Sequence, residues 1–176
     1  VFFTVKQDTT RMNLRAGVIN GPKNPQFSFT TILTGEIRDR DAELIAEYKN
    51  GKGETGVLLG VNARPLVGGR GKGDGLAFTL IPAEPIIAFR KFHFNENHNW
   101  IYLHKNMRVY ANVDMWDDEG MGFRVHSVEG DTVSLQNIDV EIRRIRLDEI
   151  TSVLPYFPEI TGLFSAEAHY IQTEKD

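Results

Sequence analysis

The segment with the clearest chemical potential is a glycine-rich loop, residues 64–75, which reads RPLVGGRGKGDG. Its successive glycine N–H groups, together with Arg64, Arg70 and Lys72, could contact an anion. The spacing is not that of a P-loop, because the Gly-Lys pair is followed by glycine and not by Ser or Thr. The loop also leads into a strand-like run, whereas a dinucleotide-binding loop leads into a helix. Two interpretations stay open: a mobile hairpin loop without a catalytic role, or a cationic finger that contacts nucleic acid or a partner protein.

Three histidines, His93, His98 and His104, lie in one segment with Glu96. Imidazoles beside a carboxylate are ligands that zinc and iron use. Alternate residues of an extended chain are about 6.6 to 7 Å apart, which places His98 and His104 about 20 Å apart. These two cannot bind one ion, and a site from His93 and His98 would need a turn between them. We therefore predict exposed histidines and no metal site.

Four acidic residues, Asp114, Asp117, Asp118 and Glu119, precede Gly120. A calcium loop alternates acidic residues with others and ends in a distant glutamate, and that order is missing here. The segment is therefore interpreted as a solvated acidic turn. The chain also lacks a G-x-S-x-G elbow and an HExxH motif. The sequence predicts no catalytic residue and no cofactor.

The elements that must position these groups are mostly strands. Between residues 101 and 150, apolar and polar residues alternate in five short runs separated by turns at 105–106, 117–120 and 129–131. A short turn of helix is expected at 147–150. The pattern predicts a small closed β-barrel whose inner residues are Ile101, Leu103, Val109, Ala111, Val113, Phe123, Val125, Val128, Val133, Leu135, Ile138, Val140 and Ile142.

Residues 108–150, RVYANVDMWDDEGMGFRVHSVEGDTVSLQNIDVEIRRIRLDEI, resemble an SH3-like barrel of the KOW and Tudor type. The resemblance lies in the order of a strand, an acidic turn with glycine, a strand, a Gly-Asp turn and a further strand. Members of this group bind RNA, DNA, ribosomes, RNA polymerase or modified peptide tails. The resemblance therefore implies a binding platform, and it leaves the partner open.

The residues out of phase with the barrel interior form the candidate partner-binding surface. They combine planar rings with guanidinium groups, which suit stacking on bases or burial in a protein interface. The alternative is that Trp100 and Tyr102 are covered by the N-terminal half of the chain. The predicted partner-binding residues are Trp100, Tyr102, Arg108, Tyr110, Arg124 and Arg143.

The N-terminal half is expected to be a β-rich module with one helix. Strands are predicted at 1–5, 26–37, 56–62, 76–81 and 86–94. A helix is predicted at about 40–50, with an aspartate as N-cap and Asn50-Gly51 at its end. The polar run NENHN, residues 95–99, is the best linker candidate. The predicted fold is thus mainly β (α+β), with a β-rich module at 1–94, an SH3-like barrel at 99–154 and a C-terminal tail at 155–176.

Composition limits the class of protein. The chain has 176 residues, 41% hydrophobic and 25% charged, and it has no cysteine. This composition is typical of a globular protein, and the lack of cysteine excludes disulfides and thiolate chemistry. The lack of cysteine also favours a cytoplasmic location. No run of eighteen apolar residues is present, so we predict no membrane association.

Charge is distributed unevenly. Residues 1–90 carry 12 Lys and Arg against 9 Asp and Glu, a balance of +3, and residues 91–176 carry 8 against 15, a balance of −7. The first hypothesis is a non-enzymatic binding protein that interacts with nucleic acid or with the transcription or translation machinery. The alternatives are a structural or adaptor subunit of a protein assembly and an enzyme of unrecognised family. The oligomeric state stays open.

Overall fold

The structure is a computed structural model that describes residues 1–21, 27–66, 74–128, 131, 134–154, 156–158 and 160–173. Within these residues it is almost entirely β. The strands are β1 (Phe2–Gln7), β2 (Arg11–Asn20), β3 (Phe29–Arg38), β4 (Asp41–Asn50), β5 (Thr55–Leu66), β6 (Gly75–Ile87), β7 (Arg90–Lys91), β8 (His93–His104), β9 (Val109–Trp116), β10 (Gly122–Ser127), β11 (Gln136–Arg146) and β12 (Leu163–Gln172), and the helix is α1 (Leu147–Ser152).

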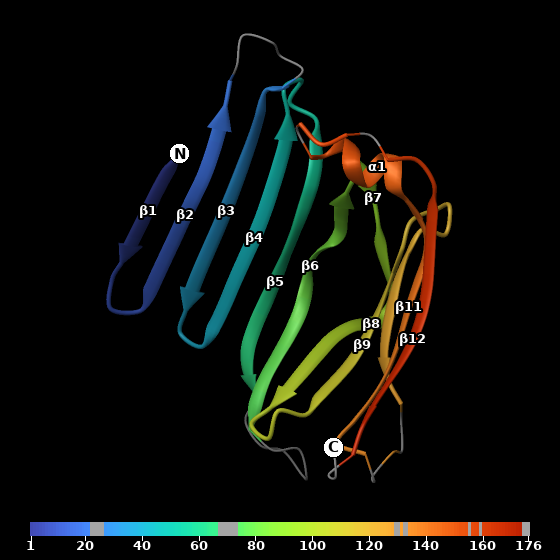
Figure 1. The fold of residues 1–176 in the computed structure, drawn as a ribbon. Helices are drawn as coiled ribbons and strands as arrows, with labels where there is room; N and C mark the ends of the chain where they lie inside the picture. The colour runs from blue at the N-terminus through green and yellow to red at the C-terminus, as the bar shows by residue number, and fades with distance from the viewer. Residues whose placement is uncertain are drawn as a thin grey trace.

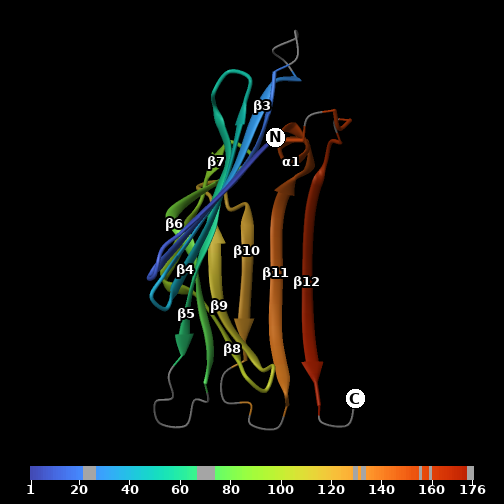
Figure 2. The same cartoon turned by 90° about the vertical axis from the view of Figure 1, so that its left-hand side faces the viewer.

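The strands form one 12-stranded antiparallel sheet. Its path is β1-β2-β3-β4-β5-β6-β8-β9-β10-β11-β12, and β7 pairs with β6 beside this path. The sheet bends, so that β1 to β5 form one wing, β10 to β12 form the other, and β6, β8 and β9 connect them (Figure 1). In the second view the strands β1 to β4 overlap one another, whereas β10, β11 and β12 lie side by side, with α1 at one end of β11 and β12 (Figure 2). The prediction of a mainly β fold is confirmed.

The predicted helix at about 40–50 is wrong, because residues 41–50 form strand β4. The segment fits two periods, and the two-residue period prevails: Ala42, Leu44, Ala46 and Tyr48 lie on one face of the sheet. A helix of ten residues is marginal in water. As a strand, β4 instead forms backbone hydrogen bonds to β3 on one side and to β5 on the other.

The predicted linker at 95–99 lies inside strand β8, where the structure has a bulge. Phe94 pairs with Met115 and Asn99 pairs with Val113, so five steps along β8 match only two along β9. The extra residues leave the ladder, and Asn97 takes a positive φ of 61°. Polar residues tolerate such an irregular backbone, which is why the same residues fit a linker in the sequence.

The division into two modules is not confirmed. Strand β8, which contains the expected boundary, pairs through residues 101–104 with β6 from the N-terminal half. The side-chain amide of Asn99 extends this pairing, because it donates to the Leu80 carbonyl at 2.8 Å and accepts from the Leu80 N–H at 3.0 Å. The C-terminal segment 155–176 contains β12, which pairs with β11. The closed SH3-like barrel stays a prediction.

The buried core is small and lies near the bend. Phe92, Met115 and Met121 form its centre, and partly buried apolar residues pack around them. Helix α1, predicted as a short helical turn, follows β11 directly. Within the described residues, no helix is both long enough and apolar enough to cross a membrane. Because this core is small, most apolar residues of the sheet lie outside it.

Candidate functional site

One face of the sheet is apolar from edge to edge. Residues that pair across antiparallel strands point to the same side, as do alternate residues of one strand. Following the pairs, with steps of two residues along β5, β6 and β9, gives one unbroken row. We call this side the apolar face, and the row is Phe3, Ala16, Leu33, Ala46, Leu59, Val61, Leu80, Phe78, Ile101, Ala111, Val113, Val125, Val140 and Ala168.

The opposite side, which we call the polar face, has a different composition. Its rows contain arginine, threonine, asparagine, aspartate and histidine, with aromatic residues near the bend and single apolar residues such as Ile45 and Leu58 between the polar ones. Members include Arg15, Thr34, Asn62, Thr79, Tyr102, Tyr110, Asn112, Asp114, His126, Asp139 and His169. The two-residue period of the sequence therefore separates the sheet into two chemically distinct surfaces.

The apolar face is buried at the bend and exposed at several positions along β1, β4 and β6. Ala111 and Val113, at the bend, are 3% and 1% exposed. Phe3, Leu44 and Leu76 are 70%, 40% and 41% exposed. Water-facing apolar surface of this extent usually marks a binding surface. The arrangement can therefore hold an apolar partner.

The apolar face lies on the inner side of the bend. Phe92, which follows β7, packs against Met115, a member of this face. In Figure 1, β7 and α1 lie between the two wings. Both wings therefore direct apolar side chains toward the space between them.

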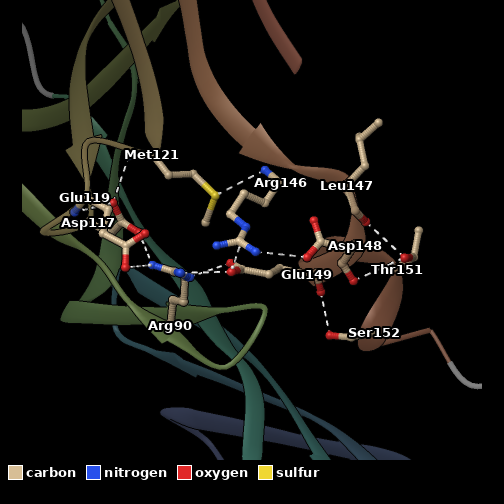
Figure 3. A network of polar contacts seen from close by, with 10 residues as sticks. All are labelled: Arg90, Asp117, Glu119, Met121, Arg146, Leu147, Asp148, Glu149, Thr151 and Ser152. Carbon is tan, nitrogen blue, oxygen red and sulfur yellow. Dashed lines mark hydrogen bonds and ion pairs between the residues drawn. The ribbon is translucent and has the colours of Figure 1, made fainter. Parts of the chain in front are cut away.

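Arg90 links β7 to helix α1 at one end of this space (Figure 3). Its guanidinium donates two hydrogen bonds to Glu149, with Nη2 to Oε1 at 2.8 Å, and a third from Nη1 to Asp117 Oδ2 at 2.9 Å. Glu119 Oε1 lies 3.2 Å from the same Nη1. These carboxylates, Glu149 first among them, raise the pKa of Arg90. The charged network fixes α1 over the end of the apolar face.

The segment after α1 reaches the other wing. Tyr156 stacks on Phe27 with ring centroids 5.0 Å apart, and its hydroxyl accepts a hydrogen bond from the Asn20 side chain at 3.2 Å. Asn20 is the last residue of β2, and Phe27 lies in the connection from β2 to β3. Tyr156 therefore bridges the two wings at the end that α1 occupies.

The predicted aromatic residues do come together on the polar face. The rings of Trp100 and Tyr102 stack with centroids 4.5 Å apart, and both are half-buried. Tyr110 pairs with Tyr102 across the strands and contacts the ring of His104 edge-on. Tyr110 is 36% exposed, so it is the most accessible of the three predicted rings.

The predicted arginines are already engaged within the protein. Arg108 donates to the backbone carbonyls of Ser134 and Leu135, the latter at 3.1 Å. Arg124 donates to Asp114 at 3.1 Å, and Glu141 lies 3.6 Å from it. Arg143 donates to Glu141. The guanidinium groups of Arg124 and Arg143 both lie over the Trp116 ring.

The anion-contacting loop is described only in part. Arg64 lies in β5 and pairs with Ala77. Arg70 and Lys72 lie outside the described residues. The prediction that the three residues contact an anion is therefore untested.

The interpretation of the acidic segment as a solvated turn is wrong for two of its residues. Asp114 is 1% exposed and Asp117 is 5% exposed. Asp114 lies inside β9, and Asp117 Oδ1 accepts the backbone N–H groups of Glu119 and Met121 at 2.9 and 2.8 Å. Only Asp118 and Glu119 face solvent. The spacing of the acidic residues shows that the segment is not a calcium loop. It does not show which carboxylates are buried and hydrogen-bonded.

Comparisons of the chain with protein-family models, curated proteins and solved structures gave no match.

Proposed function

We propose that the protein is a non-enzymatic binding protein that holds a long apolar chain, the acyl chain of a lipid, against its apolar face. The observation that carries this proposal is the unbroken apolar row from β1 to β12, on a face where Phe3, Leu44 and Leu76 are exposed. A face of this kind gains free energy whenever apolar area leaves water. Burying about ten methylene groups of a ligand would contribute roughly 8 kcal/mol before the cost of association.

The composition of the apolar face favours an acyl chain over an extended polypeptide. A polypeptide segment carries a backbone N–H and C=O at each residue, and each needs a hydrogen-bond partner when it is buried. The apolar row offers aliphatic and aromatic side chains only, and the sheet backbone beneath it is already paired. An acyl chain has no polar group along its length, so it is buried without that penalty.

Nucleic-acid binding stays a prediction that the described contacts support less well. The three predicted arginines of the polar face, Arg108, Arg124 and Arg143, already have carbonyl or carboxylate partners. A phosphate would have to compete with Asp114 and Glu141 for Arg124 and Arg143, and with two backbone carbonyls for Arg108. Phosphate contacts supply most of the affinity in sequence-independent nucleic-acid binding. With its arginines engaged, this surface lacks the main source of that affinity.

The test uses a fluorescent fatty acid and a matched pair of substitutions in β5. Leu59 belongs to the apolar face, and its neighbour Leu58 points to the opposite side. Both are half-buried. Leu59→Asp places a carboxylate where the acyl chain would desolvate it, so we expect affinity to fall about tenfold or more. Leu58→Asp should change it less than about threefold.

Circular dichroism checks that both variants are folded, and unlabelled palmitate should displace the probe from the unmodified protein. Two results would reject the proposal: no saturable binding by the unmodified protein, or equal loss of affinity in the two folded variants.

A structural or adaptor role is a second candidate, and the sheet edges favour it. Within the described residues, β1 pairs only with β2, and β12 pairs only with β11. Unpaired edges offer backbone groups to another strand. Light scattering of the purified chain tests this role, which predicts that the chain forms an oligomer. Val5→Pro removes a backbone donor from β1, so it should weaken that oligomer. A monomer at all concentrations would contradict it.

A further inference from the structure

We propose that His98, Asp114 and His126 form a binding site for a divalent transition-metal ion, with Zn²⁺ as the ion of choice. The site lies on the polar face, so it is independent of the acyl-chain proposal. One ligand atom from each residue lies within 4.8 Å of the other two. The three side chains come from three adjacent strands, β8, β9 and β10.

The fold brings these residues together by register and by the bulge. His126 pairs with Asn112 across β9 and β10, and Asp114 lies two residues further along β9. His98 belongs to the bulge of β8, and its ring meets that of His126 edge-on with centroids 5.5 Å apart. Its Nδ1 lies 3.7 Å from Asp114 Oδ2. The bulge places His98 beside Asp114 and His126. Residue spacing along β8 does not reveal this bulge, so the sequence alone predicts no site.

The strongest argument is the set of buried polar atoms that lack a partner. Three of these atoms are His98 Nδ1, His126 Nε2 and Asp114 Oδ1, each of which is inaccessible to solvent and forms no hydrogen bond. The same is true of Asn112 Oδ1 on the same face. The Asp114 side chain is 2% exposed. Leaving a buried polar group without a partner costs about 1 to 3 kcal/mol, and natural proteins rarely concentrate several such atoms at one point. A bound cation would satisfy the lone pairs of all three ligands.

The donor set selects the class of ion. Two imidazole nitrogens and a carboxylate oxygen suit zinc and its neighbours, whereas magnesium and calcium require mostly oxygen ligands. Zinc bonds to these atoms at about 2.0 to 2.2 Å, so ligand atoms of a tetrahedral site lie about 3.4 Å apart. The ligand atoms, which lie within 4.8 Å of one another, therefore need to approach by about 1.4 Å at most. Three protein ligands leave a fourth position for water or a small anion.

The charged neighbours leave the required oxygen available. Arg124 and Asn95 both bind Asp114 through Oδ2, at 3.1 and 2.6 Å, which leaves Oδ1 open. The positive charge of Arg124 opposes a cation, but Glu141 lies 3.6 Å from its Nη1 and offsets it. Arg124 and Asn95 then act as positioning residues that hold the Asp114 carboxylate in place.

The experiment is calorimetric titration of the full, untagged and chelator-treated chain with Zn²⁺ at about pH 7.5, where histidine is mostly neutral. We expect one ion per chain with a dissociation constant of about 10 μM or lower. His98→Gln and His126→Gln should each weaken binding at least tenfold. The matched control is His93→Gln in the same strand, because His93 is half-exposed and outside the cluster. It should change affinity less than twofold.

A spectroscopic readout keeps the proposal testable if one variant loses stability. Co²⁺ in a four-coordinate site with nitrogen ligands has visible absorption, and the unmodified chain should show it while the folded His126→Gln chain does not. Circular dichroism establishes which variants are folded. The proposal is overturned if the unmodified chain binds no stoichiometric Zn²⁺, or if His93→Gln weakens binding as much as His126→Gln.

Discussion

Replacing Arg90 by methionine should detach helix α1 from the sheet and lower stability. Arg90 makes two hydrogen bonds to Glu149 and one to the buried Asp117, and its side chain is 24% exposed. Hydrogen bonds to charged groups contribute about 1.5 to 3 kcal/mol each, and screening by solvent reduces this for a partly exposed group. Asp117 keeps two backbone donors. We therefore expect a loss of about 3 kcal/mol.

For a chain of this length, that loss corresponds to a fall of about 8 °C in the unfolding midpoint, measured by calorimetry. A double-mutant cycle with Glu149→Gln isolates the pair, and we expect a coupling of about 1.5 kcal/mol. The control is Lys105→Met, which removes an exposed ion pair with Asp74 and should cost less than about 1 kcal/mol. A coupling below about 0.3 kcal/mol would refute the reasoning that this network anchors α1.

Three further predictions concern the core, the end bridge and acid sensitivity. Phe92→Ala should cost about 3 to 5 kcal/mol in denaturant unfolding, because Phe92 is 1% exposed at the centre of the core, and a loss below about 1 kcal/mol would contradict that placement. Tyr156→Ala should speed hydrogen exchange in the segment after α1, since its stacking on Phe27 is lost, whereas Tyr156→Phe should keep most of the protection; equal exchange in both would show that the stack is unimportant. The pKa of Asp8 should lie below 3.8, because the Thr10 and Arg11 N–H groups donate to its carboxylate. Its contribution to the β1–β2 turn is therefore present above about pH 3.8 and is lost as the pH falls through the folded-state pKa; an NMR titration midpoint at or above 3.8 would count against it.

The two-residue alternation of the sequence predicts much of what the sheet does. It separates Ile101, Ala111 and Val113 from Tyr102 and Tyr110 correctly, because burial on one side leaves a strong signal in each strand. The alternation does not show how strands join. Whether the alternating runs close into a barrel or continue one open sheet depends on pairing between distant strands, and no local pattern encodes that pairing.

Residues 41–50 and 95–99 show the limits of local patterns in more detail. Ala42, Leu44 and Tyr48 fit a helical stripe as well as a strand, and only the free edges of β3 and β5 decide between them. The polar run at 95–99 has the composition of a linker, and a bulge uses the same residue types. His98 and Asp114 are sixteen positions apart in sequence, so their proximity is a product of register and bulge that spacing does not reveal.

The central claim is that an acyl chain lies on the apolar face, and photo-crosslinking tests it most directly. A fatty acid with a diazirine in its tail is bound to the full chain, irradiated and located by mass spectrometry. We predict adducts on apolar-face residues such as Leu59, Val61 and Phe78, and competition by unlabelled palmitate. Adducts spread equally over Leu58, Asn62 and Thr79 on the other side, or no adduct that palmitate displaces, would contradict the claim.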